Sequence, residues 1–279
     1  MVAHVVTAEN APPEVVRARR PQWLILMLMG DFAFERPVAL STGTFLDVLG
    51  QLDIGAHTAR STLQRMCDRG LLTRYRQGRE VYFGLTERST TLLRRGRAES
   101  WRPVDPEWDG TWTIVAFSIP EDRRATRQRL RSRLAWAGFG LLQSGLWIAP
   151  GEVDVAPLID DLDVLEQVKA FAGAPTAMTT VNELIGEAYD IDELADRYRG
   201  FLRRWADGEE GQYPNALAAL LVLQGEWQQV SQSDPRLPLR HLPPHWPGIE
   251  ADQLFRARFA VLEAPARRDL DQMARSIDL

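Results

Sequence analysis

The sequence is short of cysteine and of long hydrophobic runs, with one cysteine among 279 residues. Cys67 alone can form neither an intrachain disulfide nor a cysteine-rich zinc site, which suits a reducing compartment. The apolar run at 23–30 is far shorter than the roughly 20 residues of a membrane span, and the acidic, aromatic stretch after it offers no signal-peptidase site. We therefore expect a cytoplasmic protein that makes no contact with a membrane.

Common catalytic and cofactor motifs are also missing. The sequence has no phosphate-binding P-loop, no GxSxG nucleophile elbow and no GxGxxG dinucleotide turn. His241 and His245 have the spacing of zinc ligands on a helix, but Pro243 and Pro244 between them exclude a regular helix. We therefore predict no catalytic residue, no metal site and no cofactor.

Charge is distributed unevenly along a chain whose net charge is −5. Residues 1–100 contain 14 arginines and 10 acidic residues, whereas residues 101–279 contain 19 basic and 28 acidic residues. Within 55–100 alone there are 10 arginines and 4 acidic residues. A basic module joined to acidic ones indicates that one part meets a polyanion. From charge alone, the alternative is a solvated basic surface.

The basic part begins with a pattern of three helices. The first starts near Pro21, a residue suited to a first helical turn, and the second follows Ser41, a good N-cap. Glycines bound the third, which spans 55–70 and carries polar or basic residues on its first turns.

The third helix and the segment after it complete a known layout. Ala59, Leu63 and Met66 recur at intervals of four and three residues and predict one buried stripe. Residues 71–76 and 80–85 then have the pattern of two strands, joined by a tight turn at Gln77-Gly78. Three helices followed by a basic hairpin indicate a winged helix-turn-helix.

Beyond a proline-containing linker the sequence alternates strands and helices. We expect a βαββαβ, or ferredoxin-like, arrangement. Its elements are predicted at 111–119, at 121–138, in two short strands that turn at Ser144-Gly145, at 155–165 and at 168–171. From residue 178 onwards the pattern is almost entirely helical.

At 279 residues the chain is too long for one small core. We place it in the α+β class, with a winged helix-turn-helix, a ferredoxin-like domain and an all-helical C-terminal domain. The predicted boundaries are 1–20 for a flexible arm, 21–98 for the winged helix, 99–108 for the linker, 109–175 for the ferredoxin-like domain and 176–279 for the helical domain.

Three segments together resemble the PaaX-like transcription regulators, the phenylacetic-acid-degradation repressor family. They are QWLILMLMGDF with GAHTARSTLQRMCDRGLL and the hairpin, residues 108–151, and DPRLPLRHLPPHWPG with QLF. The resemblance covers roughly residues 20 to 265. It implies a winged-helix DNA-binding domain, a central ferredoxin-like domain, a helical C-terminal domain and a homodimer. The best-known members repress genes of aromatic catabolism and are released by an aryl-CoA thioester such as phenylacetyl-CoA.

The residues of the third helix suit DNA recognition on their own account. A recognition helix presents its N-terminal residues to base edges in the major groove, where Arg pairs with guanine and Gln or Ser reaches bases or phosphates. Arginines at the hairpin tip are placed to reach phosphates. The predicted contacts with double-stranded operator DNA are His57, Thr58, Arg60, Ser61, Gln64, Arg65, Arg76 and Arg79. For any single arginine, the alternative is a solvated surface charge.

The alternative function is a metal-dependent nuclease or a thioesterase that its winged helix tethers to nucleic acid. Residues 117–148 also resemble the small CRISPR-associated endoribonuclease fold, whose first strand ends in a metal-binding aspartate. Here that position is Ser118, a poor ligand for a divalent cation. We therefore favour a non-enzyme whose central domain builds the dimer. Trp205, Trp227 and Trp246 are expected in the core, so no residue is assigned to an effector.

Overall fold

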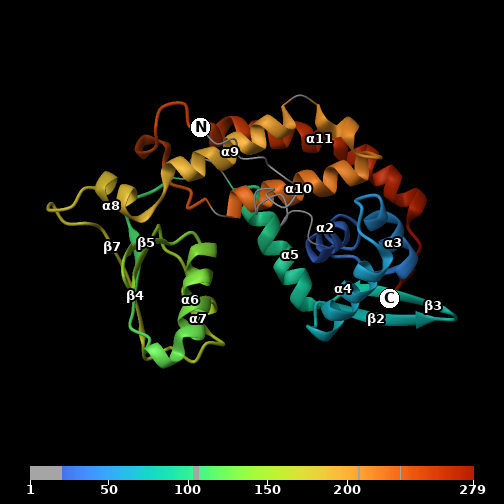
Figure 1. The fold of residues 1–279 in the computed structure, drawn as a ribbon, viewed down its shortest axis with the longest axis horizontal. Coiled ribbons are helices and arrows are strands. Elements are labelled where there is room, and N and C mark those ends of the chain that lie inside the picture. The colour runs from blue at the N-terminus through green and yellow to red at the C-terminus, as the bar shows by residue number, and fades with distance from the viewer. Residues whose placement is uncertain (1–20, 103–106, 207, 233) are drawn as a thin grey trace, which may run out of the picture. The chain divides into compact units, whose positions relative to one another are not determined.

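The computed structural model describes residues 21–102, 107–206, 208–232 and 234–279, and the chain divides into two compact units (Figure 1). Unit 1 combines the chain up to Trp101 with Phe201–Gln229 and Gln253–Leu279. Unit 2 combines Arg102–Gly200 with Val230–Asp252. The predicted arm at 1–20 and the middle of the predicted linker lie outside the described residues.

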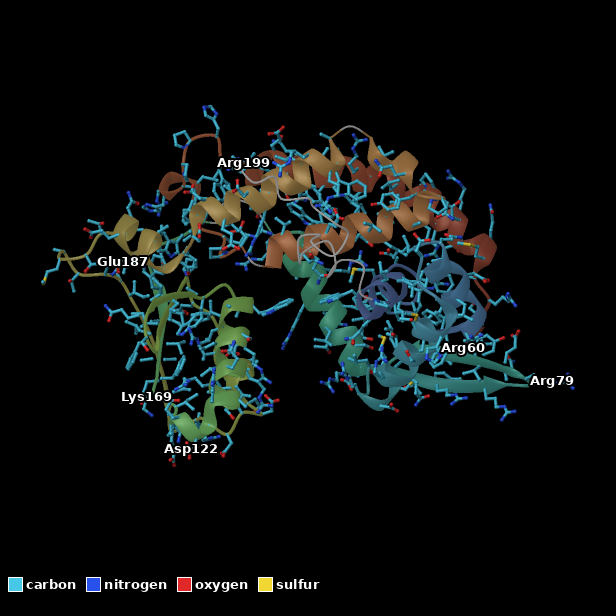
Figure 2. All side chains as sticks on the ribbon, in the orientation of Figure 1. Arg60, Arg79, Asp122, Lys169, Glu187 and Arg199 are labelled. Carbon is cyan, nitrogen blue, oxygen red and sulfur yellow. The ribbon has the colours of Figure 1, made fainter. Side chains whose placement is uncertain are left out.

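The N-terminal part of unit 1 has the order of a winged helix-turn-helix. Its elements are α2 (Pro21–Phe32), β1 (Val38–Ser41), α3 (Thr42–Gly50), α4 (Ala56–Asp68), β2 (Leu72–Gln77), β3 (Glu80–Leu85) and α5 (Glu87–Ser100). The predicted N-cap is confirmed, because Ser41 Oγ accepts a hydrogen bond from the N–H of Thr44 at 3.1 Å. The hairpin of β2 and β3 carries Arg79 at its tip (Figure 2).

The end of the chain adds a fourth strand to the winged-helix sheet. β8 (Ser276–Asp278) pairs antiparallel with β1, which gives the strand order β2-β3-β1-β8. The expectation that the C-terminal segment is helical throughout is therefore wrong at its last residues. Three residues are too few to show a period of two in the sequence, and their partner strand lies at the other end of the chain.

Four α-helices form most of the described C-terminal segment: α8 (Val181–Ala188), α9 (Ile191–Trp205), α10 (Ala216–Gln232) and α11 (Pro247–Met273). The expectation that their tryptophans belong to the core is confirmed, since Trp205, Trp227 and Trp246 are all buried. Trp227 stacks on Phe255, with ring centroids 4.7 Å apart.

A buried carboxylate connects α2 to the C-terminal helices of unit 1. Gln224 Nε2 donates a hydrogen bond to Asp31 Oδ1 at 3.1 Å, and Arg267 Nη1 donates one to the backbone oxygen of Asp31 at 3.2 Å. Asp31 Oδ2 is buried without a hydrogen bond from any described residue. Burial raises the pKa of Asp31 to about 6; the charge of Glu263 also raises it, whereas Gln224, Arg97 and Arg267 lower it.

Unit 2 contains the predicted βαββαβ order and an antiparallel sheet with strand order β5-β6-β4-β7. Its elements are β4 (Trp112–Phe117), α6 (Arg124–Trp136), β5 (Gly140–Gln143), β6 (Leu146–Pro150), α7 (Ala156–Ile159) and β7 (Val168–Gly173). A single 3-10 turn, Glu121–Arg123, precedes α6. The helix predicted at 155–165 is wrong in length. It is only the four-residue α7, and turns follow in which Asp163 has a left-handed φ of 51°.

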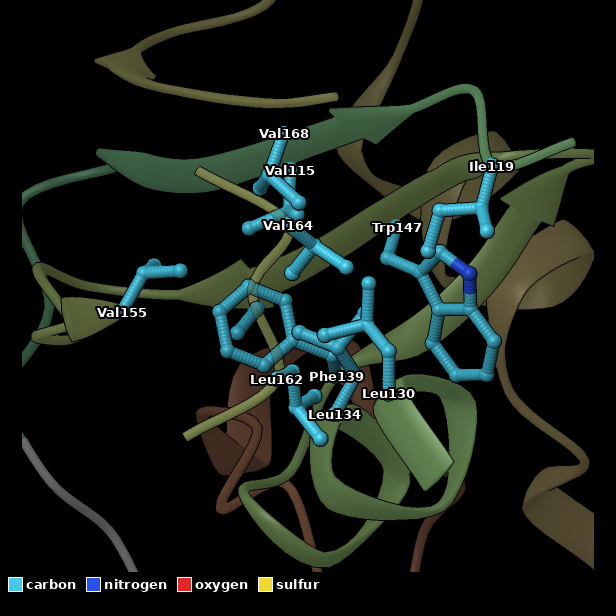
Figure 3. Packing of buried hydrophobic residues seen from close by; sticks show 11 residues of the cluster. Val115, Ile119, Leu130, Leu134, Phe139, Trp147, Val155, Leu162, Val164 and Val168 are labelled. Atoms are coloured by element: carbon cyan, nitrogen blue, oxygen red, sulfur yellow. The ribbon is translucent and has the colours of Figure 1, made fainter. Parts of the chain in front are cut away.

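An apolar cluster packs α6 and the loops against one face of this sheet (Figure 3). Leu130 and Leu134 lie one helical turn apart on α6 and point into the cluster, where Phe139 and Trp147 are also buried. Most of the other residues of α6 are exposed.

We expect Gly145→Ala to lower the free energy of unfolding by about 2 kcal/mol or more. Gly145 has a φ of 80° in the turn between β5 and β6, and a Cβ there would lie 2.6 Å from the backbone oxygen of Phe117. Gly151→Ala is the matched control, because Gly151 has a φ of 77° but open space around its Cβ position. Urea unfolding of both variants checks the difference, and equal losses would contradict the close contact.

We expect Asp31→Asn to remove a pH dependence of stability. Because the folded state raises the pKa of Asp31 from 3.8 to about 6, it binds this proton more tightly than the unfolded chain does. The contribution of this proton to the free energy of unfolding is complete below the pKa that Asp31 has in the unfolded chain. It is lost as the pH rises through the pKa in the folded chain, by about 1 kcal/mol between pH 5 and pH 7. Urea unfolding across this interval should show that slope in the native chain and a shallower one in the variant; parallel slopes would refute it.

Candidate nucleic-acid interface

Helix α4 has one buried and one exposed side. The buried side consists of Ala59, Thr62, Leu63 and Met66. It contacts α2 and α3, and the predicted apolar stripe is thereby confirmed. Thr62 joins that stripe because its hydroxyl is satisfied within the helix: Oγ1 donates to the backbone oxygen of Thr58 at 2.8 Å.

The residues predicted to contact DNA from α4 lie on the other side of the helix. All of them are exposed except for one half-buried serine: His57, Thr58, Arg60, Ser61, Gln64 and Arg65. The first turn of α4 contains no acidic residue, so the partial positive charge of the helix N-terminus is not neutralised from within the helix. This surface therefore offers donors and positive charge to an anion.

Hydrogen bonds within α4 hold some of these side chains and leave others free to reach outward. Arg65 Nη2 donates to Thr62 Oγ1 at 2.9 Å and Arg65 Nη1 donates to Ser61 Oγ at 3.3 Å. Gln64 Nε2 donates to Asp68 Oδ1 at 2.8 Å. Within the described part of the chain, Arg60 makes no hydrogen bond or ion pair, so its guanidinium keeps its full capacity for a ligand.

The hairpin forms a second basic surface next to α4 in the chain. Gln77 pairs with Glu80, so the turn residues are Gly78 and Arg79, one position later than predicted. Gly78 has a φ of 61°, which explains the shift, since glycine is the residue that tolerates this conformation. Arg76 and Arg79 are both exposed, and Arg76 Nε donates to the backbone oxygen of Gly78 at 3.3 Å.

Arg74 is an exposed basic residue of the hairpin that the sequence reasoning missed. It lies two residues before Arg76 on β2 and therefore on the same face of the strand. The signal was present as alternating arginines in LTRYRQ. The acidic residue of the hairpin, Glu80, accepts a hydrogen bond from Tyr82 at 2.6 Å, and this bond raises the pKa of Tyr82.

The features weighed for catalysis lie apart from one another. In the described ranges, no three His, Cys, Asp or Glu side chains come together where they could hold a metal ion. Ser118 is exposed directly after β4, and His241 Nδ1 lies 2.9 Å from Asn182 Oδ1. His245 is a loop residue with a φ of 60°. No helix of the described chain is both long and apolar enough to cross a bilayer.

Unit 2 has a hollow of about 760 Å³ between α8, the start of α9 and residues 240–243. The Arg240 guanidinium lies 5.6 Å from the ring centre of Trp108 and donates to the Trp108 backbone oxygen at 3.2 Å. Glu187, Asp190 and Asp192 add negative charge to the lining. Because the Arg240 guanidinium is already bound to Trp108 and carboxylates line the same hollow, the hollow suits the phosphates of a CoA thioester poorly. We therefore assign no effector residue here.

Comparisons with known proteins match successive parts of the chain to one family. Residues 20–89 match the family model described as PaaX-like protein, residues 105–185 the PaaX protein central Cas2-like domain, and residues 189–272 the PaaX-like protein C-terminal domain. The chain is 28% identical to the Transcriptional repressor PaaX of Escherichia coli (strain K12) over 244 residues, which is 83% of this chain and 77% of that protein.

A solved structure shares the fold. It is the uncharacterized protein Rv0674 from Mycobacterium tuberculosis, with a TM-score of 0.60 and 23% sequence identity over 88% of this chain and 97% of the other.

Proposed function

The chain belongs to the PaaX-like protein family, and on that premise we propose that it is a sequence-specific DNA-binding transcriptional repressor and not an enzyme. The observation that carries the proposal is the two-sided α4, with a buried apolar side and an exposed side of hydroxyl, amide and guanidinium groups. Such a helix can enter the major groove and read base edges. The family's E. coli relative, named a transcriptional repressor, supports the same function.

Each surface has a separate role in this proposal. Arg60 and Arg65, with their neighbours on α4, face base edges, where a bidentate arginine discriminates guanine. Arg76 and Arg79 on the hairpin bind phosphates and fix the register of the helix. We also propose that the winged helix spans 21–98, the ferredoxin-like domain 109–175 and the helical domain 176–279.

The protein's assembly and its control by a ligand follow from the same family resemblance. We infer a cytoplasmic homodimer that the ferredoxin-like domain builds, which reads two half-sites of a roughly palindromic operator. The helical domain takes a small-molecule effector, an aryl-CoA thioester of the phenylacetyl-CoA type, and releases DNA from genes of aromatic catabolism. Family resemblance supports these points. Ser118, an exposed hydroxyl at the end of β4, argues against a metal-dependent nuclease.

We expect Arg60→Ala with Arg65→Ala to abolish the preference for the protein's own promoter DNA over a mixed-sequence duplex. Each base-contacting arginine contributes about 1–3 kcal/mol, so the promoter affinity falls by roughly tenfold to a hundredfold per residue. Arg76→Ala with Arg79→Ala is the comparison, which should weaken both duplexes alike. Anisotropy titrations at low salt measure the affinities of the native chain and of both double variants for the two duplexes. Equal binding of both duplexes by the native chain would contradict sequence-specific recognition.

We expect an aryl-CoA thioester to raise the thermal unfolding midpoint and to lower the affinity for promoter DNA. A ligand at a hundred times its dissociation constant stabilises the folded state by about 2.7 kcal/mol. The controls are coenzyme A and the free aromatic acid, each alone. The effector class is wrong if the thioester shifts the midpoint no more than coenzyme A does, and release of free coenzyme A would support the thioesterase instead.

A further inference from the structure

Helix α6 of unit 2 carries a concentration of positive charge that the proposed function leaves unused. Residues 121–136 contain six arginines and two acidic residues, although residues 101–279 together are acidic. The helix belongs to the central domain and not to the winged helix. Its charge therefore needs an explanation of its own.

Half of these arginines are engaged inside unit 2. Arg127 pairs with Glu121 at 2.9 Å, and Arg123 lies 3.7 Å from Asp163. Arg133 forms a two-pronged pair with Asp161, with Nη2 to Oδ2 at 2.9 Å, and this bond is the main reason that the pKa of Asp161 falls to about 2. All three arginines are partly buried, so they fasten α6 to the turns that follow it.

The other half have no such partner. Arg124, Arg129 and Arg131 are exposed, and none forms an ion pair or hydrogen bond with a described residue; the charge of Arg129 only adds to that of Arg133 in lowering the pKa of Asp161. At 100° per residue, Arg124 and Arg131 lie along one flank of the outward side and Arg129 along the other. Uncharged side chains fill the strip between the flanks: Ala125, Gln128, Ser132 and Ala135, with the exposed Trp136 at its C-terminal end.

We propose that this outward side of α6 is a second DNA-contact surface, which binds the phosphate backbone of a duplex without reading sequence. Guanidinium groups match phosphate geometry in a bidentate manner and stay charged at every physiological pH. Two flanks of arginine beside a strip of uncharged side chains let the backbone come close to the helix. Of the residues in the strip, Gln128 and Ser132 carry side-chain groups that suit hydrogen bonds to phosphate oxygens as well as to bases.

A polyanion fits this surface better than a protein partner does. Protein interfaces are built around a buried apolar or aromatic centre with few charged residues. Here the only large apolar side chain on the exposed part of α6 is Trp136, at its C-terminal end. Unpaired cations without an acidic residue between them are the footprint of phosphate binding.

The test is the salt dependence of binding to a duplex of about 40 base pairs of mixed sequence by the full chain. The variant R124Q/R129Q/R131Q removes the three unpaired cations. If each contacts one phosphate, the slope of log affinity against log salt becomes shallower by about 0.9 per arginine. Between about 50 and 200 mM salt, the native chain then loses about 40-fold more affinity than the variant.

A matched control and single variants make the result decisive. R199Q/R203Q/R268Q removes three exposed arginines from α9 and α11, of which Arg199 pairs with Asp196, and should leave the slope unchanged. Each single variant of α6 should account for about a third of the effect, so the result does not depend on the triple variant alone. Thermal unfolding confirms that every variant is folded.

The outcomes separate this surface from the winged helix. In a chain that already carries R60A/R65A, the slope should still fall when the α6 arginines are removed; the inference therefore stands even where promoter recognition fails. A native slope in the triple variant overturns the inference and leaves the proposed function intact. A weaker dimer in sedimentation, with an unchanged slope, would assign α6 to a protein interface and overturn it as well.

Discussion

The burial of one side of α4 is the constraint on which the candidate DNA surface depends. Ala59, Leu63 and Met66 have almost no exposed area, and α2 and α3 cover them. A helix whose apolar side is fixed in this way cannot rotate without exposing that side to water. The orientation of Arg60 and its neighbours therefore follows from the packing behind them, although none of these side chains contributes to the core.

The same packing extends to the far end of the chain. Ser41 and Thr44 begin α3, and both also bind the segment after α11: Ser41 N–H donates to the Arg275 oxygen at 2.7 Å, and Arg275 N–H donates to Thr44 Oγ1 at 2.9 Å. β8 then continues along β1. The start of α3, and through α3 the support of α4, thus rests on residues more than 230 positions away.

Prediction from the sequence succeeded for features that neighbouring side chains decide, and it failed where a distant partner strand or a backbone angle decides. The stripe of α4 and the Ser41 cap need only neighbouring residues, and both were predicted. β1 was not predicted, because all four of its residues are buried and it shows no alternation. The turn at Gly78 was placed one residue early, since a backbone angle and not a side chain decides it. The buried apolar stripe of α4 correctly indicated that the predicted contact residues lie on the exposed side of the helix. Their contacts with bases stay predictions.

The arginines show most clearly what a sequence cannot separate. Lys169 is the only lysine, so arginine supplies nearly all of the positive charge, for structural and for binding purposes alike. Arg133 and Arg131 are two residues apart on α6, yet the first fastens the helix to Asp161 and the second faces solvent. Their difference lies in a carboxylate that the fold brings to one of them. At physiological salt, screening limits the range of interaction between exposed charges to about 8 Å. Local pairing of this kind, and not the net charge of −5, therefore decides where the chain can bind a polyanion.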